Sequence, residues 1–98
     1  MEPNMWKVQP KKVRIVVEKI PSDEEGNVCH ILKEGQVFTY DFDTLPGGFC
    51  ASAWNSIYPA LRVIELGGSH PWDKEPGVTR ACCPDQGKPV TFRIETYE

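Results

Sequence analysis

The stretch FCASAWNSIYPALRVIEL, residues 49–66, decides the fold because its apolar residues follow a helical period. They recur at steps of three, one, three, four and three, on one stripe of a helix: Cys50, Ala53, Trp54, Ile57, Leu61 and Ile64. Gly67 and Gly68 follow, and glycine ends a helix readily because it adopts the left-handed conformation without penalty. Pro59 removes one backbone hydrogen bond and clashes with the preceding turn. We therefore expect one main helix, kinked near Pro59 or broken there into two short helices.

Short stretches on both sides of this helix alternate between apolar and polar residues, the pattern of half-buried strands. We expect strands at residues 12–20, 36–42, 78–83 and 89–96, and a short extended segment at 28–33. The residues expected to face inward are Val13, Ile15, Val17, Phe38, Tyr40, Phe42, Val90, Phe92 and Ile94. About four short strands and one helix predict an α+β domain, with the helix covering one face of a small, mostly antiparallel sheet.

Length and charge limit the class of protein. The 98 residues support one domain, which we place at 12–98, after a loose N-terminal arm at 1–11. The net charge of −3 argues against a nucleic-acid binder, which needs a basic face. No apolar run reaches the roughly 18 residues of a membrane span, and the first ten residues lack the apolar stretch of a signal peptide. The expectation is a soluble, cytoplasmic protein that binds neither nucleic acid nor membrane.

Four cysteines, Cys29, Cys50, Cys82 and Cys83, are the main chemical feature of the chain. Without a sign of export, reduced thiols or a bound metal are favoured over disulfides. Neighbours in a strand point to opposite faces, so Cys83 can serve a site while Cys82 packs elsewhere. Cys50 opens the helix, where the positive end of the dipole favours a thiolate. The spacing is not that of a zinc finger, since it has no C-x-x-C pair and no matching pair of histidines.

Three hypotheses for function remain open at this point. In the first, Cys29, Cys50 and Cys83 bind zinc or iron, with His30, Asp85 or water as the fourth ligand. In the second, Cys50 is the catalytic nucleophile of a thiol-based redox enzyme, and Cys29 or Cys83 resolves the intermediate. In the third, the cysteines only pack in the core of an accessory or interaction module. An exposed strand edge or the loop around Trp72 would then take a protein partner or a second copy of the chain.

Three further side chains could support such a site. Asp85 is expected either to accept backbone hydrogen bonds in a turn or to orient a neighbouring ligand. Trp72 either covers the core or, with His70, forms the wall of a small-molecule pocket. His70 is otherwise expected to be a solvated loop residue. The chain has no glycine-rich phosphate loop and no G-x-S-x-G nucleophile elbow.

A series of short motifs runs along the chain in a characteristic order. They are C-x5-G-x-x-F from Cys29, P-x-G-x-C-x-x-A from Pro46, Y-P at Tyr58, G-G-x-x-P-W from Gly67, C-P-D from Cys83 and P-V-x-F from Pro89. This order resembles a family of small, uncharacterised prokaryotic proteins, over roughly residues 12–96. The resemblance implies that Cys29, Cys50 and the Cys83-Pro84-Asp85 motif are signature positions and that Cys82 is not. It implies no established activity, and this chain departs from the pattern at His30 and Gln36, where members often have proline and aspartate.

Overall fold

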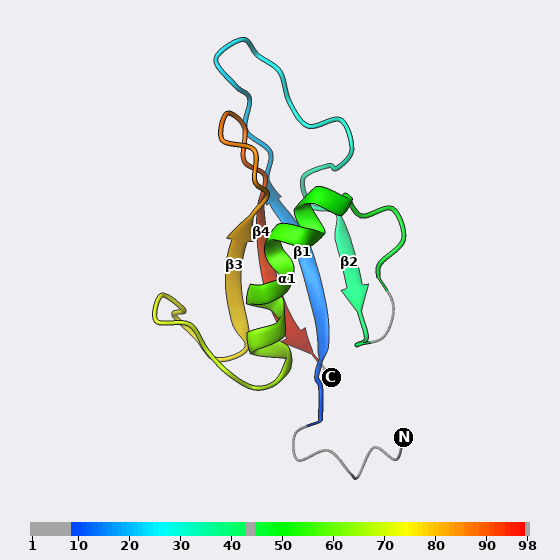
Figure 1. The fold of residues 1–98 in the computed structure, drawn as a ribbon, viewed down its shortest axis with the longest axis vertical. Helices are drawn as coiled ribbons and strands as arrows, with labels where there is room; N and C mark the ends of the chain where they lie inside the picture. The colour runs from blue at the N-terminus through cyan, green and yellow to red at the C-terminus, as the bar shows by residue number, and fades with distance from the viewer. Residues whose placement is uncertain (1–8, 43–44, 98) are drawn as a thin grey trace.

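Four strands and one helix make up the fold in the computed structural model, which describes residues 9–42 and 45–97. The elements are β1 (Lys12–Lys19), β2 (Val37–Tyr40), α1 (Ala51–Glu65), β3 (Val78–Cys82) and β4 (Thr91–Tyr97). The strands form one sheet in the order β2-β1-β4-β3, and every neighbouring pair is antiparallel. The helix lies across one face of this sheet (Figure 1). The α+β class and the helix-on-sheet arrangement expected from the sequence are thereby confirmed.

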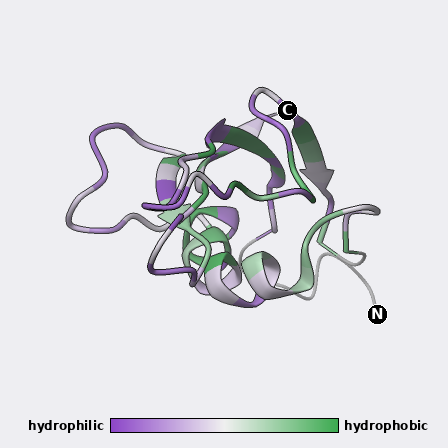
Figure 2. Ribbon diagram, turned by 90° about the horizontal axis from the view of Figure 1, so that it is seen from above, coloured by the Kyte–Doolittle hydropathy of each residue, from purple (hydrophilic) through white to green (hydrophobic). Residues whose placement is uncertain are grey.

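The core lies between α1 and the sheet. Each strand contributes alternate residues to it, because successive side chains of a strand point to opposite faces. Figure 2 shows hydrophobic residues both in the strands and on the helix that covers them. The buried hydrophobic residues are Val13, Ile15, Val17, Leu32, Phe38, Tyr40, Ala53, Ile57, Leu61, Ile64, Val90, Phe92 and Ile94. All the expected inward residues are among them except Phe42, which is half-buried.

The helix α1 continues through Pro59 without breaking into two. Pro59 is exposed, and so is Asn55, whose carbonyl loses its usual partner at this position. Water can reach that carbonyl, which lowers the cost of the missing bond. The break expected as one alternative is therefore wrong, while a kink at Pro59 stays a prediction.

The end of α1 is fixed by the glycine pair. Gly67 has a φ of 90°, and its N–H donates to the carbonyl of Ile64 at 3.0 Å. The N–H of Gly68 donates to the carbonyl of Val63 at 2.8 Å. These two bonds are those of a Schellman motif, in which the residue after the cap takes the left-handed conformation.

The segment at 28–33 lies outside the four strands of the sheet, and its expected extended conformation stays a prediction. It belongs to a long loop at residues 20–36, in which only Leu32 is buried against the core. The base of the loop is closed by backbone bonds from Gly35 to Val17 and from Val17 to Gln36, at 2.8 and 2.9 Å. Cys29 of this segment and Ile20 at the start of the loop are partly buried and also pack against the core. The strand expected at 36–42 is also shorter, since Phe42 has a φ of 70° that no strand accommodates.

The sheet face opposite the helix carries a ladder of ion pairs. Arg14 and Arg93 both contact Glu95, at 3.1 and 2.7 Å. Arg80 and Arg93 both contact Glu18, at 3.0 and 3.8 Å. Arg80 and Arg93 are direct neighbours in the β3–β4 register, and Glu18 offsets their repulsion. Part-exposed pairs such as these contribute little to stability individually.

Among the described residues, one charged side chain is fully buried. Glu65, at the end of α1, has no exposed surface, and Arg62 donates to its Oε1 at 3.0 Å. Its Oε2 has no hydrogen-bond partner in the part of the chain that the structure describes. Burial raises the pKa of this carboxyl above its ordinary value, because the charged form is poorly solvated, and Arg62 opposes this in part. No helix within the described ranges is long and apolar enough to cross a membrane.

Candidate thiol site

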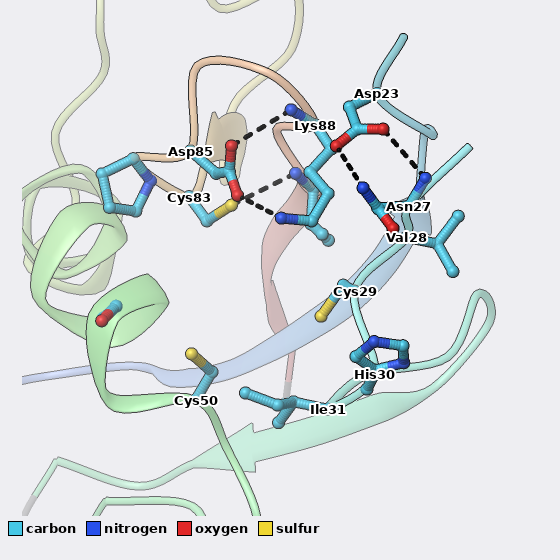
Figure 3. A pocket seen from close by; sticks show the side chains of 13 residues that line it. Asp23, Asn27, Val28, Cys29, His30, Ile31, Cys50, Cys83, Asp85 and Lys88 are labelled. Carbon is cyan, nitrogen blue, oxygen red and sulfur yellow. Dashed lines mark hydrogen bonds and ion pairs between the residues drawn. The ribbon is translucent and has the colours of Figure 1, made fainter. Parts of the chain in front are cut away.

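Three cysteines from distant parts of the sequence line one cavity of about 590 Å³. Cys29 comes from the loop at 20–36, Cys50 from the start of α1, and Cys83 from the residue after β3. The sheet register explains why they meet, since Cys82 and Lys19 both pair with Thr91. The chain beyond β1 and the chain beyond β3 therefore leave the sheet at the same end. Figure 3 shows the three sulfur atoms around the space between these segments.

Cys50 is the N-cap of α1. Its φ of −69° and ψ of 126° are extended, and its carbonyl accepts the first helical bond from the N–H of Trp54 at 2.9 Å. Its side chain makes no cap hydrogen bond, and the first turn holds no acidic residue. The sulfur thus lies beside the positive end of the helix dipole. No carboxylate in the first turn interacts with that positive end in its place.

Cys83 is held by the chain that leads into β4. Its N–H donates to the carbonyl of Val90 at 3.0 Å, and the N–H of Val90 donates to its sulfur at 3.3 Å. The thiol is half-buried, whereas that of Cys82 is exposed, so the neighbours point apart as expected. The carbonyl of Cys82 accepts a bond from the Ser56 hydroxyl of α1 at 3.0 Å, which ties the end of β3 to the helix. Cys82 is not among the residues that line the cavity.

Asp85 and Lys88 form a charged turn on the wall of the cavity. The Asp85 Oδ1 accepts bonds from the N–H groups of Gly87 and Lys88 at 3.0 and 3.2 Å, and its Oδ2 contacts the Lys88 Nζ at 2.7 Å. These bonds, led by the Lys88 side chain, hold the pKa of Asp85 below its ordinary value. Asp85 therefore contacts its own turn and makes no hydrogen bond to a thiol within the described residues. Nothing in these contacts supplies the expected orienting role.

Cys29 lies on the loop that faces this turn. It is half-buried, while Val28, His30 and Ile31 around it are exposed. Upstream, the Asp23 carboxylate accepts bonds from the N–H groups of Glu25 and Asn27, both at 2.9 Å, and closes the tip of the loop. In Figure 3 the His30 ring lies beyond Cys29, away from Cys50 and Cys83.

The cavity does not hold a preassembled metal site. Among residues 9–42 and 45–97, no three histidine, cysteine, aspartate or glutamate side chains are grouped closely enough to hold a metal ion. The expected ligands Cys29, Cys50, Cys83 and His30, and the acidic Asp85, do line the same cavity. These side chains lie on different walls of the cavity. Cys83 and Asp85 already accept hydrogen bonds from neighbouring backbone N–H groups.

His70 and Trp72 lie away from the thiol cavity, in the loop between α1 and β3. Trp72 is 61% exposed, so the expectation that it covers the core is wrong. Its ring stacks on the His70 ring with centroids 4.4 Å apart, and it lines a separate cavity of about 430 Å³. The His70 Nδ1 contacts Asp73 at 3.0 Å, and the Thr79 hydroxyl donates to the same carboxylate at 2.6 Å. His70 is thus part of a hydrogen-bonded clamp on this loop and is not simply solvated.

Sequence reasoning missed several residues of the thiol cavity. Lys88, Asp23 and Asn27 line it with the cysteines, and so does Ser52. Asp85 offered a clue to this turn, because aspartate side chains often accept a hydrogen bond from the backbone two residues on, as Asp85 does from Gly87. The approach of Asp23 to this turn depends on the folding of the long loop and has no local pattern.

Comparison of the chain with protein-family models, with curated proteins and with solved structures yields no match. The resemblance stated above therefore stays a prediction. The site has to be interpreted from its own geometry.

Proposed function

We propose that this chain is a small metal-binding protein whose thiol cavity takes a thiophilic ion, zinc in the first place and iron as the alternative. Cys29, Cys50 and Cys83 are the proposed thiolate ligands, and His30 or water completes the set. The observation that carries the proposal is the convergence of three thiols, from three separate segments, on one cavity. Thiolate-rich sets select zinc and iron over magnesium and calcium.

Binding in this proposal requires the loop at 20–36 to move toward the other two thiols. Cys50 is fixed by the start of α1 and Cys83 by its pairing with Val90. Cys29 has exposed neighbours on both sides, and the nearest residue buried in the core is Leu32. Cys29 itself packs against the core through its partly buried side chain, so its displacement gives up that contact. A shift of the loop would bring the third ligand into range and would bury part of Val28 and Ile31.

The test is elemental analysis of the full chain, purified without oxygen or chelator. About one zinc or iron ion per chain is expected, as in a mononuclear site. Cys29→Ser, Cys50→Ser and Cys83→Ser should each lower the occupancy strongly. Cys82→Ser is the matched control, because its side chain is exposed and lies outside the cavity. A folded protein that stays metal-free after addition of zinc or ferrous ion would refute the proposal.

The second candidate is a thiol enzyme with Cys50 as the nucleophile. It is favoured by the Cys50 side chain, which makes no cap hydrogen bond at the N-terminus of a 15-residue helix. A free thiolate there should react with an alkylating reagent much faster than Cys82, although Cys82 is more exposed. A metal-bound thiolate should instead be protected until the metal is removed. Alkylation of the protein before and after chelation therefore separates the two candidates.

A further inference from the structure

The loop that carries Cys29 and the turn that follows Cys83 already touch. A Cβ built at Gly87 would lie 3.7 Å from the Asp23 Cβ, so the two backbones are neighbours at this point. Both segments leave the sheet at the same end, since Lys19 and Cys82 share the partner Thr91. Figure 3 shows Asp23, Asn27 and Cys29 on one side of the cavity and Cys83, Asp85 and Lys88 on the other.

Lys88 links the two segments electrostatically. Its ammonium group pairs with Asp85 at 2.7 Å, and this contact is the main reason why its pKa is raised. Asp23 and Cys29 of the facing loop add smaller contributions in the same direction.

Cys83 has a feature of its own. Its sulfur accepts the N–H of Val90 at 3.3 Å, a bond that holds the side chain at the wall of the cavity. Cys29 and Cys83 are both half-buried on the wall of one cavity of about 590 Å³. Cys50 is attached to α1, which packs against the sheet along its length and so is less free to approach either thiol.

We propose that Cys29 and Cys83 form a reversible disulfide across the cavity, which closes the loop at 20–36 onto the turn at 83–90. Because the disulfide consumes two of the three proposed ligands, it would also switch the site from a metal-binding form to a metal-free form. This regulatory part rests on the proposed function, whereas formation of the disulfide does not.

The oxidant is a small disulfide such as oxidised glutathione. The Cys83 thiolate attacks one of its sulfur atoms, which forms a mixed disulfide and releases one glutathione thiolate. The Cys29 thiolate then attacks the Cys83 sulfur and releases the second glutathione. Two protein thiols are oxidised, one glutathione disulfide is reduced, and the two protons end on the two released glutathione molecules. Excess reduced glutathione drives the reverse sequence.

The experiment uses the metal-free full chain with Cys82→Ser, which removes the exposed thiol and leaves the cavity unchanged. After incubation with oxidised glutathione, peptides are mapped by mass spectrometry without reduction. The expected result is a dominant link between Cys29 and Cys83, with Cys50 still alkylatable. In the same background, Cys29→Ser should instead keep a stable glutathione adduct on Cys83, because the resolving thiol is gone. Persistent glutathione adducts without an internal link, or a dominant link that includes Cys50, would overturn the proposal.

Zinc binding of the reduced and oxidised forms separates this proposal from the proposed function. If the Cys29–Cys83 link forms but the reduced chain takes up no zinc or iron, the disulfide stands and the metal site fails. If the reduced chain binds zinc and no link forms, the metal site stands and the disulfide fails. If both hold, oxidation should reduce zinc uptake at least tenfold, and reduced glutathione should restore it.

Discussion

A disulfide between Cys29 and Cys83 is expected to stabilise the fold by up to about 4 kcal/mol. The perturbation is oxidation of a chain with Cys50→Ser and Cys82→Ser, in which only this link can form. The link closes a loop of 83 − 29 = 54 residues. With the loop-closure relation for disulfides, this length corresponds to about 4 kcal/mol at 25 °C. The full value assumes an unstrained native state, so any cost of moving Cys29 toward Cys83 lowers the gain.

Urea unfolding of the oxidised and the reduced form of this same chain measures the gain directly. Tryptophan fluorescence is a suitable probe, because Trp54 packs on Tyr40 with ring centroids 5.1 Å apart. With a slope of about 1–3 kcal/mol per molar urea, the midpoint should rise by roughly 1.5–4 M. An oxidised form less stable than the reduced form would refute the reasoning, since it would mean that the native fold holds these two thiols too far apart.

Four further predictions concern other parts of the molecule. Thr79→Val removes the hydroxyl that donates to the buried Asp73 carboxylate and should cost about 1.5–3 kcal/mol in urea unfolding; a loss below about 0.5 kcal/mol would contradict the clamp. Ile57→Ala should cost about 2–5 kcal/mol, because its side chain is fully buried between α1 and the sheet; a neutral effect would mean that the helix does not pack there. Glu65→Gln tests the raised pKa of Glu65. In the wild-type chain the neutral carboxyl contributes its full stability below pH 4.5, the ordinary pKa of a glutamate, and this contribution is lost as pH rises through the folded-state pKa. The variant should therefore gain stability relative to wild type as pH rises above 4.5, and a difference that does not change with pH would contradict the assignment. In Cys82→Ser, zinc at about 100 times its dissociation constant should raise the free energy of unfolding by about 2.7 kcal/mol, and chelator should abolish this gain. In Cys83→Ser, zinc should give no such gain; an equal gain in both variants would place the metal elsewhere.

Most of the fold could be predicted from the sequence, because alternation and helical period directly report which residues are buried. Val13, Ile15 and Val17 in β1 and the stripe of α1 through Ile57 are examples. The packing of the segment at 28–33 had no such pattern, since only Leu32 is buried there and Cys29 packs partly against the core. Glu65 could not be predicted to be buried, since its position at the edge of the apolar stripe depends on how the helix is turned against the sheet.

The site could be predicted only in part. Helix starts and strand ends depend on residues that are close in the sequence. The sequence therefore allowed Cys50 to be placed at a helix start and Cys83 at a strand end. Their meeting with Cys29 depends on the sheet register. That the described residues form no preassembled metal group depends on where each side chain lies. The clamp of His70, Asp73 and Thr79 joins a loop to a strand, and no periodic pattern indicates such a contact.

The convergence of three thiols on one metal is tested most directly by titrating the reduced chain with cobalt(II), whose thiolate bonds give charge-transfer absorption. The account predicts saturation at about one ion per chain. It also predicts that this absorption weakens in Cys29→Ser, Cys50→Ser and Cys83→Ser and is unchanged in Cys82→Ser. Absorption that is absent in the reduced chain, or that depends on Cys82 as much as on the other three, would contradict it.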